Sequence, residues 1–104
     1  MRRAVFPGSF DPITLGHKDI LDRSIKIFDE VIIAVGNNSN KKYMFELEKR
    51  IEFIQKTALE SSSFTITSYS GLTVEFCKKS KANFLIRGLR NPNDFEFEKA
   101  IAHT

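Results

Sequence analysis

Short apolar runs alternate with amphipathic stretches along this sequence. The apolar runs are rich in β-branched residues and are followed by turn residues, which is typical of buried strands. They predict strands at 2–6, 31–35, 64–67 and 83–86. Between them, apolar residues recur at helical spacing and predict helices over about 15–28, over about 46–59 and from about 72 onwards. In the third of these helices we expect Leu72, Phe76 and Cys77 to face the core.

The regular alternation of strands with helices predicts an α/β fold. Helices then cover both faces of a doubly wound, Rossmann-like parallel sheet. A last helix is predicted after the fourth strand. Its cap would be Asn93 or Asp94, and its apolar residues would be Phe95, Phe97 and Ile101.

Length and composition indicate one globular domain. The chain has 104 residues, of which 41% are hydrophobic and 28% charged, which is ordinary for a globular protein and argues against a disordered or fibrous class. Its net charge of +3 is dispersed, which suits a small anionic substrate as well as nucleic acid. A single cysteine excludes an intrachain disulfide and favours a reducing, cytoplasmic location. We find no apolar stretch long enough for a signal peptide or a membrane span.

Residues 7–17 read Pro-Gly-Ser-Phe-Asp-Pro-Ile-Thr-Leu-Gly-His and connect the first strand to the first helix. Glycine allows sharp turns and close approach of the backbone to a ligand, while proline keeps the loop from continuing either element. The unpaired N–H groups and the dipole of a helix N-terminus attract anions such as phosphate. His17 falls in that first turn. A histidine there commonly makes only a local hydrogen bond, but the preceding loop favours a functional interpretation.

Other loops are predicted to end at the same carboxyl edge of the sheet, where ligands of parallel sheets bind. They carry Lys41 and Lys42, Gly71 to Thr73, and Arg87 to Arg90. Their charges are mostly positive, and two arginines a few residues apart suit bidentate binding of phosphate. Four loops therefore converge on a site for an anionic, phosphate-rich ligand.

Simpler structural interpretations exist for these residues. The two lysines can belong to a solvated loop, and Leu72 and Thr73 can serve packing and helix capping. The alternative partners of Arg87 and Arg90 are the acidic residues Asp94, Glu96 and Glu98. Cys77 is interpreted as a small buried apolar residue, and neither His103 nor any other residue shows metal-ligand spacing.

Several motifs together point to one family. Thr14-Leu15-Gly16-His17 matches the (H/T)xGH signature of the nucleotidylyltransferase superfamily. Lys-Lys-x-Met-Phe at 41–45, Leu-Ile-Arg-Gly-Leu-Arg at 85–90 and Asp-Phe-Glu-Phe-Glu at 94–98 follow it. With the Pro-Gly-Ser-Phe-Asp-Pro segment, the whole chain resembles the bacterial phosphopantetheine adenylyltransferase family.

The resemblance implies transfer of AMP from ATP to 4'-phosphopantetheine, giving dephospho-coenzyme A and pyrophosphate, with Mg²⁺ and a homohexamer. It implies catalytic roles for His17 and Lys41, with His17 at the ATP phosphates. Substrate-side positions would be Ser9, Lys41, Thr73 and Arg87, of which Ser9 and Lys41 hold the substrate phosphate. Nucleotide-side positions would be Ser9, Phe10, His17, Gly88, Leu89, Arg90 and Glu98. No residue is assigned to a metal, and no nucleic-acid or membrane partner is expected.

The family continues for another third of a chain, with a further strand and an ISSTxxR-like motif that this sequence lacks. Residues 1–104 would then be the N-terminal two thirds of a nucleotidylyltransferase domain, and a fragment is favoured over a truncated product. One alternative is another superfamily member, such as a cytidylyltransferase. A non-catalytic nucleotide- or RNA-binding module is the other, although the aromatic residues follow core periodicity and form no stacking ladder.

Overall fold

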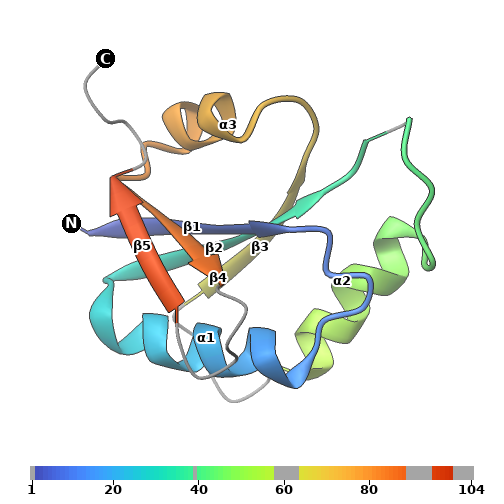
Figure 1. The fold of residues 1–104 in the computed structure, drawn as a ribbon, viewed down its shortest axis with the longest axis horizontal. Coiled ribbons are helices and arrows are strands. Elements are labelled where there is room, and N and C mark those ends of the chain that lie inside the picture. Colours follow the sequence, from blue (N-terminus) through green and yellow to red (C-terminus); the bar gives the residue numbers. More distant parts are fainter. Residues whose placement is uncertain (1, 39, 58–63, 89–94, 100–104) are drawn as a thin grey trace.

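The computed structural model describes residues 2–38, 40–57, 64–88 and 95–99. Within them, one sheet has the strand order β3-β2-β1-β4-β5 (Figure 1). Strands β1 to β4 run parallel, and β5 pairs antiparallel with β4. The elements in chain order are β1 (Arg3–Gly8), α1 (Leu15–Ile27), β2 (Glu30–Gly36), α2 (Leu47–Thr57), β3 (Phe64–Tyr69), α3 (Thr73–Ser80), β4 (Phe84–Gly88) and β5 (Phe95–Lys99).

Helices cover both faces of the sheet, which confirms the predicted doubly wound α/β class. Figure 1 shows α1 and α2 on one face and α3 on the other. Alternate residues of a strand point to opposite faces, so each parallel strand contributes side chains to a hydrophobic core on either face of the sheet. In β1, Ala4 and Phe6 pack with the residues of α1 and α2, whereas Val5 packs with Cys77 of α3.

The predicted last helix is wrong. Phe95–Lys99 is instead a strand, paired with β4 so that Arg87 stands opposite Glu96. The reason is the period of its apolar residues, because phenylalanine alternates with glutamate at the two-residue period of a half-buried strand. The proposed capping residues and Ile101 lie outside the described residues.

The end of β1 and the orientation of Leu72 also differ from the sequence prediction. β1 continues through Pro7 and Gly8, which the sequence assigned to the loop. Proline is tolerated there because the pairing of β1 with β4 ends at Val5 and only β2 continues beside it. Leu72, predicted to face the core, is 66% exposed, because this N-cap residue has extended backbone and leaves the helical stripe. The predicted inward position of Cys77 is confirmed.

Candidate active site

The loops after three neighbouring parallel strands enclose a pocket at the carboxyl edge of the sheet. Its volume is about 240 Å³. Ser9 follows β1, Lys41 belongs to the connection after β2, and Gly71 follows β3. The full lining is Gly8, Ser9, Gly36, Asn37, Asn38, Lys41, Tyr43, Tyr69, Ser70 and Gly71. The structure therefore brings Ser9 and Lys41, two of the predicted site residues, into one pocket.

Phe10 turns inward from this loop. Its φ of 48° lies in the left-handed region, which is uncommon for a residue with a side chain, and the residue is 2% exposed. The ring packs edge-on against Phe6 and His17, with centroids 5.2 and 5.0 Å apart. A Cβ on Gly8 would lie 3.1 Å from it, so glycine leaves room for this packing. The structure therefore places Phe10 in the core and does not present its ring at the pocket.

His17 is held by the start of α1. Its backbone N–H donates to Thr14 Oγ1 at 3.2 Å, and its Nδ1 accepts from the backbone N–H of Thr14 at 3.0 Å, forming a capping box. Because Nδ1 is an acceptor, the proton of the neutral ring is on Nε2. Burial lowers the pKa of His17 below its ordinary value of 6.5. At neutral pH, His17 is therefore an uncharged Nε2–H donor in the first turn of the helix.

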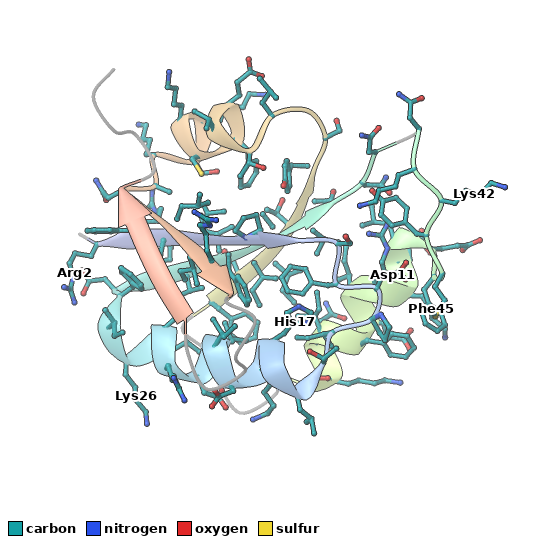
Figure 2. The ribbon with its side chains drawn as sticks, viewed as in Figure 1. Arg2, Asp11, His17, Lys26, Lys42 and Phe45 are labelled. Carbon is teal, nitrogen blue, oxygen red and sulfur yellow. The ribbon has the colours of Figure 1, made fainter. Side chains whose placement is uncertain are left out.

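Asp11 connects the loop after β1 to the segment before α2. Its carboxylate accepts hydrogen bonds from the backbone N–H of Met44 and, at 2.8 Å, from that of Phe45. Figure 2 shows Asp11 beside Phe45, with His17 at the start of the neighbouring helix. Sequence reasoning missed this residue, although its place between two prolines marks a loop of fixed shape.

The turn that carries Lys41 is held by its own residues and by Tyr43. The backbone N–H of Lys41 donates to the Asn38 carbonyl at 3.0 Å, and the Asn38 N–H donates to the Tyr43 hydroxyl at 2.9 Å. The Lys41 ammonium lies 5.9 Å from the centre of the Tyr43 ring. Lys41 is thus an exposed cation at the rim of the pocket.

Arg50 of α2 is the second residue that sequence reasoning missed. It is 1% exposed, and its guanidinium stacks 3.9 Å from the centre of the Tyr43 ring. The signal was its position on the apolar stripe of α2, three residues after Leu47 and four before Ile54. An arginine at a core-facing position must be buried, and a buried guanidinium needs specific hydrogen-bond acceptors.

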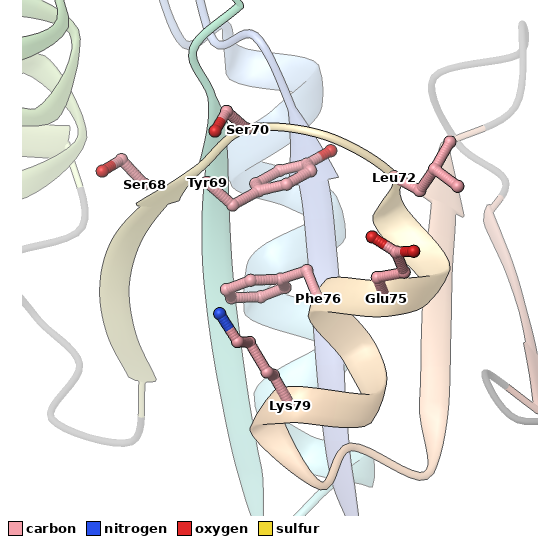
Figure 3. A pocket seen from close by; sticks show the side chains of 7 residues that line it. All are labelled: Ser68, Tyr69, Ser70, Leu72, Glu75, Phe76 and Lys79. Carbon is pink, nitrogen blue, oxygen red and sulfur yellow. The ribbon is translucent and has the colours of Figure 1, made fainter.

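A larger pocket, of about 480 Å³, lies between β3 and α3 (Figure 3). Tyr69 and Ser70 line this pocket as well as the first one, so the two pockets are adjacent. The predicted site residue Thr73 begins α3, and its hydroxyl lies 3.0 Å from that of Tyr69. The lining residues are Ser68, Tyr69, Ser70, Leu72, Glu75, Phe76 and Lys79.

The remaining predicted site residues belong to the part of the chain from β4 onwards. Arg87 is exposed near the end of β4 and is not among the lining residues of the pocket, and Gly88 ends that strand at the carboxyl edge of the sheet. Glu98 pairs in register with Leu85, away from that edge. Leu89 and Arg90 lie outside the described residues.

Within the described residues, no group of three or more His, Cys, Asp or Glu side chains could hold a metal ion. The same part of the chain contains no helix that is long and apolar enough to cross a bilayer.

Comparison with known proteins defines the class. The family model described as cytidylyltransferase-like matches residues 5–104. The crystal structure of the lipopolysaccharide core biosynthesis protein from Thermoplasma volcanium GSS1 matches with a TM-score of 0.61. It covers 80% of this chain and 70% of that protein at 24% identity, which supports the fold alone. The class is therefore that of the cytidylyltransferase-like proteins.

Relatives within this class narrow the assignment. The phosphopantetheine adenylyltransferase of Flavobacterium psychrophilum is 64% identical over 104 residues, which is all of this chain and 69% of that protein. Those of Flavobacterium johnsoniae and Christiangramia forsetii are 61% and 57% identical over the whole chain, which spans 68% and 69% of them. The chain belongs to the phosphopantetheine adenylyltransferase family, and the predicted resemblance is confirmed.

Proposed function

We propose that this protein transfers AMP from ATP to the phosphate of 4'-phosphopantetheine. Membership of a nucleotidyltransferase family supports the reaction class. The observation that carries the proposal is the pocket in which Ser9 and Lys41 meet. It suits a phosphate group, because a hydroxyl, a cation and the backbone of two loops surround it.

The reaction needs little help with proton transfer. A phosphate monoester has its second pKa near about 6, so the attacking oxygen is largely ionised at neutral pH and requires no general base. That oxygen attacks the α-phosphorus of ATP, a new phosphorus–oxygen bond forms, and the bond to the β-phosphate breaks with release of pyrophosphate. The protein must therefore align the two substrates and stabilise the negative charge that develops on the α-phosphate oxygens.

The geometry of His17 fits the second task. A neutral ring with its proton on Nε2 can donate to a phosphate oxygen, and the capping contacts with Thr14 fix its orientation before the substrate arrives. Ser9 and Lys41 would bind the phosphate of the acceptor substrate in the smaller pocket. Their loops are joined through Asp11, which would keep Ser9 and Lys41 at fixed relative positions around that phosphate.

The pantetheine arm is proposed to lie in the larger pocket. Tyr69 and Ser70 line both pockets, so a ligand can run from one into the other without leaving the surface. Tyr69 and Phe76 offer flat apolar surface there, with ring centroids 5.0 Å apart. Contacts of Phe10, Gly88, Leu89, Arg90 and Glu98 with the nucleotide, and of Thr73 and Arg87 with the acceptor, remain predictions.

Mg²⁺ is proposed to enter with ATP. The described residues provide no ligand set of their own for a metal, and Mg²⁺ is commonly bound through substrate phosphates and water. A cytoplasmic location, which the single cysteine favours, and a homohexamer, which the family resemblance implies, are likewise proposals.

Pyrophosphate release tests the proposed function. The protein is incubated with Mg-ATP or Mg-CTP, each with and without 4'-phosphopantetheine. Release that requires both ATP and 4'-phosphopantetheine supports the proposal. Release with CTP in preference to ATP, or no release from a protein that circular dichroism shows to be folded, would contradict it.

A further inference from the structure

We infer that Arg50 is a positioning residue for the phosphate-binding pocket, an inference that rests on the proposed function. Its side chain is buried beneath the pocket and is not one of the residues that line it. Its role is to fix the relative positions of the loops after β1 and β2, whose residues Ser9 and Lys41 would bind the phosphate.

The hydrogen bonds of Arg50 reach separate segments of the chain. Nη1 donates to the carbonyl of Ser9 at 3.0 Å and to that of Gly36 at 2.9 Å. Nη2 donates to the side-chain oxygen of Asn37 at 2.9 Å, and Nε donates to the carbonyl of Phe45 at 3.1 Å. Three of these four acceptor residues line the pocket. One rigid group therefore connects the end of β1, the end of β2 and the entry to α2.

The charge of Arg50 is not neutralised within the described part of the chain. All four acceptors are neutral amide oxygens, and no described carboxylate lies within ion-pair distance of the guanidinium. Buried charges in proteins are ordinarily paired, because removing an ion from water is costly. A buried cation directly beneath the pocket favours an anion within it, so a phosphate of the substrate would supply the missing negative charge.

Lysine cannot reproduce this arrangement. The guanidinium offers donors in a fixed plane and stacks on the Tyr43 ring, whereas an ammonium is a point charge with rotating donors. Arg50→Lys therefore keeps the charge and loses the connection between the loops. Arg23→Lys is the matched control, because Arg23 lies on α1 and pairs with Asp19 at the surface.

The kinetic test separates positioning from stability. For Arg50→Lys we expect the KM for 4'-phosphopantetheine to rise at least ~10-fold, the effect of about one lost charge-assisted hydrogen bond, with the KM for ATP changed much less. A purely structural role would reduce the active fraction and leave both KM values unchanged. Arg23→Lys should match the wild type. Unchanged KM values in a folded Arg50→Lys protein would overturn the inference.

A binding test does not depend on turnover. Inorganic phosphate is titrated into the ¹⁵N-labelled protein while the backbone amides of Ser9 and Lys41 are followed by NMR. Arg50→Lys should need at least ~10-fold more phosphate for half-saturation. If the wild type releases no pyrophosphate, the proposed function fails, and this titration still decides the role of Arg50. Equal phosphate binding by the two proteins, or none by the wild type, would overturn the inference.

Asn37→Ala provides a second variant should Arg50→Lys fail to fold. It removes one acceptor of the guanidinium at an exposed position, and it leaves Arg50 and its other contacts in place. Phosphate binding should weaken in the same direction by roughly 3-fold, less than for Arg50→Lys because the other three hydrogen bonds of Arg50 remain. Unchanged phosphate binding in Asn37→Ala would count against the positioning role.

Discussion

The loops after β1 and β2 and the turn from β3 into α3 line the same edge of the sheet, but they are held very differently. The first two are joined by the carboxylate of Asp11, which accepts from backbone N–H groups before α2, and by the guanidinium of Arg50, which donates to the carbonyls of Ser9 and Gly36. At the β3–α3 turn, the N-cap residue Leu72 is 66% exposed, and Val74 in the first turn of α3 is 51% exposed. A hydrogen bond between the hydroxyls of Thr73 and Tyr69 connects the start of α3 to the end of β3.

This difference matches what each region would bind. A phosphate group is small and charged, and it is recognised by donors at fixed positions, so its pocket must be ordered before binding. An extended, mostly uncharged arm gains affinity from contact area, which exposed apolar side chains beside a wide pocket can supply. Substitutions in the first region should therefore change the reaction strongly, and substitutions in the second should change it weakly.

The largest effect is expected for His17→Ala. Removing a single preorganised donor to the developing charge lowers kcat by at least ~100-fold. The fold should persist, because Thr14 can still cap α1. Pyrophosphate release and circular dichroism measure the two properties. Turnover near that of the wild type would remove His17 from the mechanism.

The second-largest effect is expected for Lys41→Ala. Losing its charge-assisted contact with the acceptor phosphate is expected to lower kcat/KM for 4'-phosphopantetheine by ~10- to 100-fold. Lys42→Ala is the matched control, because Lys42 is also exposed but is not one of the lining residues given above for the pocket. Steady-state kinetics measure kcat/KM for both variants. An equal loss of kcat/KM in Lys42→Ala would indicate a general effect of surface charge.

Asp11→Asn should have an intermediate effect, mainly on stability. The amide has one acceptor oxygen for two backbone N–H groups, so about 1–3 kcal/mol of unfolding free energy is lost, and the KM for 4'-phosphopantetheine rises. Asp22→Asn removes only an exposed ion pair with Lys18 and should cost less than ~1 kcal/mol. Urea denaturation compares the two. Equal stabilities would show that Asp11 does not connect the loops.

The smallest effect is expected for Thr73→Val in the second region. It removes one hydroxyl that contacts Tyr69 and keeps the side-chain shape, so about 1 kcal/mol of stability is lost. The KM for 4'-phosphopantetheine should stay within ~3-fold of the wild type. Thr65→Val, at an exposed position of β3, is the control. A loss of activity as large as that of Lys41→Ala would reverse the ranking of the two regions.

The sequence predicted the parallel strands, their helices and the edge at which Ser9 and Lys41 meet, because these follow from hydrophobic period and strand direction. It did not predict β5, since the short run of alternating phenylalanine and glutamate was fitted to a helical stripe. It also could not give the contacts of Arg50. Their acceptors are mostly backbone carbonyls, which every residue has and no sequence pattern marks.

The most direct test maps the two ends of the acceptor substrate onto the two regions. ¹⁵N-labelled protein is titrated by NMR with inorganic phosphate and, separately, with 4'-phosphopantetheine. Phosphate should shift the amides of Ser9, Asn37 and Lys41, and 4'-phosphopantetheine should shift these together with Leu72 and Phe76, which line the larger pocket alone. Phosphate that shifts Leu72 and Phe76 while leaving Ser9 and Lys41 unchanged would contradict the assignment of the two regions.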